Sequence, residues 1–330
     1  RDSIPEGITI TWYPDGSKES EGTLKNGLPA GAWIKYFPNG AKQETYGYDE
    51  EGLLSGIKLI YNREGKIIRK DSIYSGGFLN GIRTNYYPEG SISSIEDLDY
   101  DTLISYKAFD HKGRQLASER LDQNKSIVYR TFYYDGTPES EGMIRNGLYE
   151  GQWKFFYPNG NVQNLLNFSG GLQSGRQISY HISGGIKDDF TCIDGLIEGE
   201  FRSFYPSGKL ERKGNFTQNE YDGEWFEYYA NDTIESRTFY HKGLRKGLSM
   251  NFALSGRRYF DEFFNNEGDS YRLILYDAEG KPSADIDYSL DSIHFTDHYP
   301  SGQIRRKGSL SDYVFHGSQE WYYPNGRLQR

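Results

Sequence analysis

The chain has 330 residues, a formal net charge of -9 and a single cysteine, Cys192. This acidic balance, without a stripe of Lys or Arg, excludes nucleic acid as an expected partner, and one cysteine excludes a disulfide framework or a cysteine-based metal site. No stretch approaches the roughly 18 consecutive apolar residues of a membrane-spanning helix, so we expect no direct membrane insertion.

One short pattern recurs from one end of the chain to the other, and repetition at a fixed spacing predicts a repeat array. It consists of a glycine, an aromatic-rich arm and a Pro-Asn-Gly turn. The clearest copies are Gly151–Gly160 (GQWKFFYPNG), Gly31–Gly40 (GAWIKYFPNG), a copy that starts at Gly223 and has Asp232 in the closing position, and a final copy that ends at Gly326.

The spacing of the turn position gives the size of the unit. From Gly16 to Gly326 it recurs in 13 steps over 310 residues, a period of about 24. Trp, Tyr, Phe and Ile in the arm favour a β-strand, Pro-Asn-Gly favours a hairpin turn, and no helical period of 3.6 is sustained. The sequence therefore predicts an all-β, elongated array of antiparallel β-hairpins, a single twisted meander sheet of about 14 units and about 28 short strands.

The combined spacing of glycine, tryptophan, paired aromatics and Asn-Gly resembles the bacterial variant of the MORN repeat. The resemblance covers nearly the whole chain and implies one repeat array over residues 1–330. Proteins of this kind often carry an antitoxin-like label, and the resemblance implies more about shape than about activity.

Two adjacent pairs of units depart from the pattern, because other residues replace the arm glycine. Two alternatives stay open: random erosion of the repeats, or two sets of seven units, residues 1–168 and 169–330, with one special pair in each. The replacing residues are Ile104 and Ile127 in the first pair, and Tyr271 and Ile293, which follows Ser292, in the second.

Alternation along the arm sorts its side chains onto two faces, with Trp153 on one and Phe156 on the other. We expect one face to be a buried spine of rings at Trp33, Phe37, Trp153, Tyr157, Trp225 and Tyr229. The opposite face carries a candidate partner-binding stripe, partly exposed: Tyr36, Phe156, Phe204, Tyr228 and Tyr322. The residues expected to be structural are Gly31, Trp33, Gly40, Gly151, Trp153, Gly160, Gly223, Trp225 and Gly326.

Polar clusters give little sign of chemistry, so we expect no catalytic residue, no cofactor and no metal site. The six histidines are scattered, and His294 and His298 would lie about 13 Å apart on a strand, too far for one metal ion. An acidic run could bind calcium, but it lacks the glycine and distal glutamate of an EF-hand, which favours a solvated loop. The run comprises Glu96, Asp97, Asp99 and Asp101.

These observations predict a non-enzymatic scaffold that binds another protein, as a subunit or accessory of a larger cell-envelope assembly. The alternative is a carbohydrate or cell-wall binding module, because choline- and glucan-binding repeats also alternate Gly-Trp turns with Tyr-rich strands. An enzyme that uses paired carboxylates is a third hypothesis, although no pair is singled out. A start at Arg1 rather than Met fits removal of a leader peptide or truncation, so we expect export to the cell envelope or surface, with a cytoplasmic location as the alternative.

Overall fold

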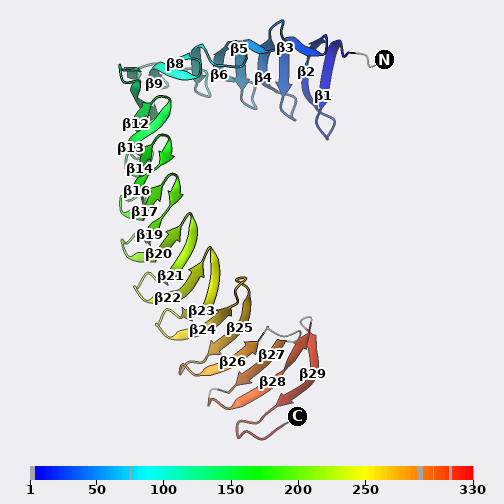
Figure 1. Cartoon of the computed structure of the whole chain (residues 1–330), viewed down its shortest axis with the longest axis vertical. Helices are drawn as coiled ribbons and strands as arrows, with labels where there is room; N and C mark the ends of the chain where they lie inside the picture. The colour runs from blue at the N-terminus through cyan, green and yellow to red at the C-terminus, as the bar shows by residue number, and fades with distance from the viewer. Residues whose placement is uncertain (1–3, 75, 288–292, 300, 312–313, 330) are drawn as a thin grey trace. The chain divides into compact units, whose positions relative to one another are not determined.

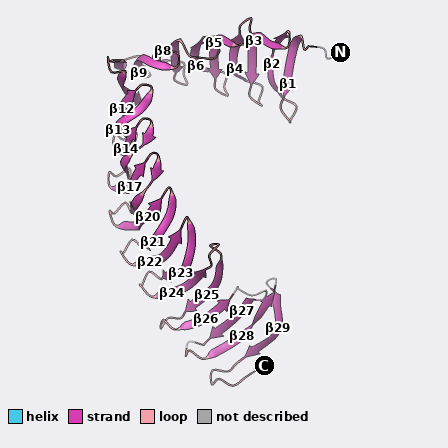
Figure 2. Ribbon diagram, in the orientation of Figure 1, coloured by secondary structure: helices cyan, strands magenta, loops and turns pink. Residues whose placement is uncertain are grey.

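The computed structural model describes residues 4–74, 76–287, 293–299, 301–311 and 314–329 (Figure 1). Within these residues it contains 29 strands and no helix, which confirms the all-β prediction (Figure 2). It therefore holds no helix able to cross a membrane in the part described. The chain forms two compact units, residues 1–162 with 168–171 and residues 163–167 with 172–330.

In the first unit, β1 to β10 pair in chain order as an antiparallel sheet, and β11 to β13 also pair in chain order. The strands are β1 (Gly7–Trp12), β2 (Lys18–Lys25), β3 (Leu28–Tyr36), β4 (Lys42–Tyr48), β5 (Leu54–Tyr61), β6 (Ile67–Ile73), β7 (Gly81–Tyr86), β8 (Ile92–Asp99), β9 (Thr102–Phe109), β10 (Gln115–Arg120), β11 (Ser126–Phe132), β12 (Pro138–Arg145) and β13 (Leu148–Phe156).

The strand β14 (Val162–Ser169) has residues in both units, and antiparallel pairing in chain order continues through the second. The strands of the second unit are β15 (Leu172–Gln173), β16 (Gly175–Tyr180), β17 (Ile186–Ile193), β18 (Leu196–Ile197), β19 (Gly199–Phe204), β20 (Leu210–Thr217), β21 (Glu220–Tyr228), β22 (Ile234–His241), β23 (Leu244–Phe252), β24 (Arg258–Phe264), β25 (Ser270–Tyr276), β26 (Pro282–Asp287), β27 (Ile293–His298), β28 (Ile304–Ser311) and β29 (Val314–Trp321).

The Pro-Asn-Gly segments form the tips of the hairpins, as predicted. At one tip the backbone N–H of Gly160 donates to the carbonyl of Tyr157 at 2.8 Å, and the N–H of Tyr157 donates to the carbonyl of Asn161 at 2.8 Å. Gly160 has φ 83°, so this is a type I turn closed by a residue in the left-handed region. Asp232 occupies the same position with φ 69°, a conformation that aspartate tolerates better than most residues.

The opposite ends of the hairpins are two-residue turns such as Asn146-Gly147, where both residues have positive φ, 51° and 78°. This is the type I′ turn, whose twist matches that of the strands. The glutamate before an arm glycine connects neighbouring repeats, because its carboxylate accepts a hydrogen bond from the backbone of the next such turn. Glu198, for example, accepts a hydrogen bond from the backbone N–H of Gln218 at 2.9 Å. Glu6 and Glu150 accept equivalent bonds from Asn26 and Gly170.

The arm glycine lies inside a bulge that delivers the tryptophan. Glu141 pairs with Lys154 and Met143 pairs with Glu150, so Gly142 alone faces the three residues from Gly151 to Trp153. Gly151 has φ 65°, which explains the preference for glycine there. A β-bulge bends its strand and re-aims a side chain. The bulge thereby places the tryptophan ring over the partner strand.

The Trp153 ring lies directly on Gly142, where a Cβ atom would come within 2.1 Å of it. Its indole N–H donates to the carbonyl of Met143 at 3.1 Å. Trp225 repeats this arrangement over Gly214 and donates to the carbonyl of Asn215 at 3.0 Å. Glycine in the return strand is therefore as necessary as the tryptophan itself, because any side chain would occupy the space of the ring.

Strand pairing, predicted to be continuous, is interrupted in the first unit between β10 and β11. The interruption coincides with the departure at Ile104 and Ile127. β9 still pairs with β8 through a one-residue bulge at Ile104, whereas β11 does not pair with the strand before it. Ile127 is instead 2% exposed and packs in a core with Tyr106, Ala108 and Ala117. Apolar packing thus replaces the hydrogen-bonded ladder at this position.

The second departure behaves differently. Tyr271 lies in β25, which pairs with both β24 and β26, and it is the extra residue where the register against β24 shifts. Ile293 begins β27, whereas Ser292 and the side chain of Ile293 lie outside the described residues. The organisation into two sets of seven units remains a prediction.

Candidate functional site

The second unit carries a buried cluster of rings on one face of its sheet. Phe201, Phe216 and Trp225 form this cluster. We call the side that carries them the tryptophan face. Phe226, which alternates to the other side of β21, marks the outer face. Of the residues expected to be structural, Trp153 and Trp225 are buried and Trp33 is half-buried.

A row of polar residues crosses the tryptophan face beside this cluster. Backbone pairing places Asp188 opposite Ser203, Ser203 opposite Arg212, Arg212 opposite Glu227 and Glu227 opposite Ser236. We call these five residues the groove row. Because paired residues on adjacent strands share a face, the row runs across β17, β19, β20, β21 and β22.

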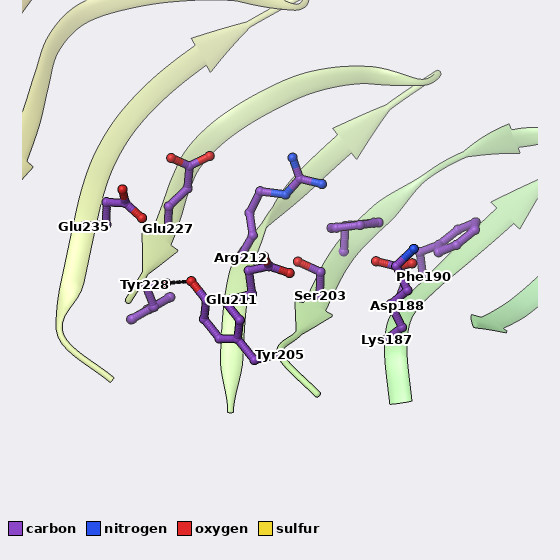
Figure 3. A pocket seen from close by; sticks show the side chains of 11 residues that line it. Lys187, Asp188, Phe190, Ser203, Tyr205, Glu211, Arg212, Glu227, Tyr228 and Glu235 are labelled. Carbon is purple, nitrogen blue, oxygen red and sulfur yellow. Dashed lines mark hydrogen bonds between the residues drawn. The ribbon is translucent and has the colours of Figure 1, made fainter. Parts of the chain in front are cut away.

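Bulges next to the hairpin tips add three charged residues. Each of Lys187, Glu211 and Glu235 is an extra residue where the register shifts, and a bulge turns such a side chain toward the face of its neighbour. Together with most of the groove row they line an open groove of about 610 Å³ (Figure 3). A second hollow, of about 270 Å³, shares Arg212 and Glu227 with it.

Arg212 is held against the floor of the groove by aromatic rings. Its guanidinium lies 5.2 Å from the ring centre of Phe201 and 5.6 Å from that of Trp225, within the range of a cation–π interaction. One nitrogen, Nη1, donates to the Tyr221 hydroxyl at 3.3 Å. No carboxylate of the described residues forms an ion pair with Arg212, so most of its five N–H groups remain available.

Ser203 is 4% exposed and lines the groove, yet its hydroxyl has no hydrogen-bond partner among the described residues. In neighbouring repeats, the serine at this position forms a hydrogen bond with a carboxylate. Ser179 donates to Asp188 at 2.6 Å, and Ser236 donates to Glu227 at 3.0 Å. Ser203 lies between Asp188, which already accepts from Ser179, and Arg212, which lies against the rings. The small accessible part of Ser203 therefore lines the groove with a hydroxyl that water or a ligand can bond to.

The groove is acidic, with four carboxylates against the two cations Lys187 and Arg212. The pKa of Tyr205 is affected by this negative charge. Burial of its phenol raises the pKa of Tyr205, and the negative charges of Glu211, Glu235 and Glu227 raise that pKa further. The same hydroxyl donates to the backbone carbonyl of Tyr228 at 2.7 Å (Figure 3). Carboxylates from three strands therefore act at one place.

The stripe expected to bind a partner lies at the last position of the arms, and all five of its rings are half-buried. Charged side chains engage several of them. Tyr36 donates to Glu21, with the Lys18 ammonium 5.3 Å from its ring centre, and the bond to Glu21 raises the pKa of Tyr36 to about 12. Tyr322 likewise donates to Glu320 beside Lys307. Tyr228 is the one stripe residue that lines the groove.

The remaining rings of the expected spine lie at the hairpin tips. Phe37, Tyr157 and Tyr229 are half-buried there, and the Tyr229 hydroxyl donates to the carbonyl of Phe252 at 2.9 Å. The tip tyrosines therefore connect one 24-residue repeat to the next instead of extending the ring cluster.

The acidic run does not converge on a cation site. Glu96 is buried and accepts from the Tyr129 hydroxyl at 3.1 Å, while Asp101 accepts from the backbone N–H of Leu79 at 2.9 Å. His294 contacts the Ser309 hydroxyl at 2.7 Å, and the side chain of His316 lies outside the described residues. Within the described residues, no three His, Cys, Asp or Glu side chains are placed to hold a metal ion.

The family model described as "MORN repeat variant" matches five segments of the chain, together less than half of it: residues 5–26, 149–169, 197–218, 221–242 and 315–330. Each matched segment begins two residues before an arm glycine, from Gly7 to Gly317. The match confirms the resemblance for these segments. A bacterial origin and the antitoxin-like label remain predictions.

No curated protein matches the sequence. Among solved structures, a crystal structure of TcdB2-TccC3 is similar at 10% identity and a TM-score of 0.19, over 99% of this chain and 25% of that one. The Photorhabdus luminescens Tc holotoxin pore is similar at 10% identity and a TM-score of 0.19, over 96% of this chain and 18% of that one. This chain thus spans a quarter or less of theirs, and similarity at this level supports no conclusion about function.

Proposed function

We propose that the chain is a non-enzymatic protein-interaction module, and that the groove on the tryptophan face of the second unit binds its partner. The observation that carries the proposal is Ser203, a residue only 4% exposed in the lining of an open groove, whose hydroxyl has no hydrogen-bond partner within the described residues. Water can bond to this hydroxyl in the free chain, and a partner that enters the groove can take the place of that water.

The form of the groove favours binding over turnover. Its side chains are spread along neighbouring strands rather than gathered around one point, as Figure 3 shows. Glu211 and Glu227 are exposed, in contrast to the water-excluding sites in which enzymes position reacting groups. Repeat architectures commonly use such extended surfaces to bind other proteins.

Carbohydrate binding is the second candidate, because the groove combines aromatic rings with carboxylates. A sugar ring stacks on an accessible aromatic face, however, and Phe201 is buried while Phe190 and Tyr205 are half-buried. The rings therefore support a protein partner better than a glycan. A place in a cell-envelope assembly and export to the envelope or cell surface remain part of this proposal, on the sequence features alone.

Affinity capture with charge-reversed variants tests the proposal. Glu211→Lys with Glu235→Lys inverts the groove without removing a hydrogen bond of the described structure, and Glu267→Lys with Glu279→Lys makes the same charge change at exposed tips of the same unit. We expect the wild type and the tip variant to retain one defined protein from a native extract, and the groove variant to lose it. No retained protein would contradict the interaction module, and retention by the groove variant would move the binding site elsewhere.

A further inference from the structure

We propose that the groove binds an extended peptide segment that carries a lysine or arginine side chain, an inference that rests on the proposed function. Two independent features define this ligand: two carboxylates without internal partners, Glu211 and Glu235, and two hydrogen-bond donors at the floor, Ser203 and Arg212.

The carboxylates of the groove favour a cationic ligand. Glu211 and Glu235 form no hydrogen bond or ion pair within the described residues, and Glu227 accepts one bond, from Ser236. An ionised carboxylate can accept about four hydrogen bonds, and a lysine ammonium offers three donors. Burial raises the pKa of Tyr205 most, and the charges of Glu211, Glu235 and Glu227 raise it further, so all three carboxylates act on this part of the groove. A cationic side chain entering between them would complete their bonding.

The two hydrogen-bond donors at the floor of the groove favour a ligand with a carbonyl acceptor. Arg212 lies 5.2 Å from the Phe201 ring centre and donates one hydrogen bond within the described residues, to Tyr221, and Ser203 lies opposite it on the neighbouring strand. A peptide carbonyl over this pair would accept from both. An inorganic cation or a polyamine has no acceptor to offer Arg212 and Ser203, and an acidic peptide would be repelled by the glutamates. Only a basic peptide uses both halves of the groove.

Fluorescence anisotropy tests this inference with a fluorescein-labelled decapeptide of alternating glycine and lysine. The comparison peptide has every lysine acetylated, which removes the charge and keeps the backbone. We expect the lysine peptide to bind the wild-type chain and the acetylated one to bind much more weakly. Ser203→Ala should weaken binding about fivefold, the equivalent of one hydrogen bond.

Charge variants separate the groove from general attraction to an acidic protein. Glu235→Gln removes a groove carboxylate that has no internal partner, so it leaves the fold intact and should weaken binding about threefold or more. Glu224→Gln removes an exposed charge from the outer face of β21, where it pairs with Arg237, and should leave binding unchanged. Equal effects of these two variants would overturn the inference, as would an unchanged affinity in Ser203→Ala.

The outcome is separable from that of the capture experiment. Failure of the lysine peptide to bind, together with a captured protein that depends on Glu211 and Glu235, would overturn the basic peptide and leave the interaction module in place. Binding of a neutral oligosaccharide in competition with the lysine peptide would instead favour the carbohydrate alternative.

Discussion

The hydroxyl of Tyr205 donates a hydrogen bond of 2.7 Å to the backbone carbonyl of Tyr228, the residue 23 positions later. The same bond recurs at one position of the repeat, because each tip tyrosine lies next to the end of the following arm. It joins Tyr13 to Tyr36, Tyr133 to Phe156, Tyr229 to Phe252 and Tyr299 to Tyr322. The tips of successive repeats are thus connected through side chains as well as through the sheet.

Tyr205→Phe removes this bond and keeps the ring. We expect a loss of about 1 kcal/mol in the free energy of unfolding, because the carbonyl of Tyr228 loses a partly buried donor. Tyr323→Phe is the matched control, since the exposed Tyr323 hydroxyl has no partner within the described residues. Urea denaturation of both variants measures the difference, and equal stabilities would show that the connection contributes nothing.

Gly142→Ala tests the contact between glycine and tryptophan. A Cβ atom there would lie 2.1 Å from the Trp153 ring, so the ring must move, and we expect a loss of about 1 to 3 kcal/mol from overpacking. At Gly185 the nearest atom to an added Cβ is 3.9 Å away, the carbonyl oxygen of Pro206. Gly185→Ala should therefore have little effect in the same thermal melts. A neutral Gly142→Ala variant would refute the packing described here.

Trp153→Ala should destabilise the first unit more than Phe156→Ala. Trp153 is 1% exposed, so its removal leaves a cavity that costs about 3 to 5 kcal/mol, while the half-buried Phe156 loses less contact area. Denaturant midpoints of the two variants give the comparison. Equal losses would mean that rings on both faces are packed alike.

Alkaline pH should destabilise the fold. Its bond to Glu21 raises the pKa of Tyr36 from 10.0 to about 12, and burial raises the pKa of Tyr46 and Tyr106. The unfolded chain loses these protons first, so it binds fewer protons than the folded chain, and stability falls as pH rises from about 10 to about 12. Denaturation midpoints over this range measure the loss.

The tyrosinate absorbance of Tyr36→Phe serves as the control for this titration. The variant should lose a component that ionises near pH 12, because Tyr36 alone is removed. A titration in which all phenols ionise together near the ordinary tyrosine pKa would contradict the hydrogen bond between Tyr36 and Glu21.

The repeat length, the strands and the tip turns could be predicted from the sequence because each depends on local residue types. Gly160 and Asp232 occupy the left-handed position that the spacing indicated. The position of Trp153 on Gly142 could not be predicted, since it depends on a bulge that puts three residues opposite one. Alternation also stops where a strand ends. It groups Tyr229 with Trp225, although β21 ends at Tyr228 and the Tyr229 hydroxyl bonds to Phe252 from the hairpin tip.

The groove was missed because its residues come from five strands and are aligned only by register. One signal was present: glutamate recurs three residues after the turn position, at Glu19, Glu139, Glu211 and Glu235. The structure shows that this is the bulged residue facing the groove in the second unit. The unpartnered state of Ser203 has no signal in the sequence, because it depends on where Arg212 lies across the sheet.

Hydroxyl-radical footprinting of the chain with its captured partner tests most directly whether the tryptophan face is the binding surface. Phe190 and Tyr205 line the groove, whereas Phe204 belongs to the aromatic stripe and Phe239 is exposed on the outer face. We predict that partner binding protects Phe190 and Tyr205 from oxidation and leaves Phe204 and Phe239 unchanged. Protection of Phe204 and Phe239 with no change at Phe190 and Tyr205 would contradict the account and place the partner on the outer face.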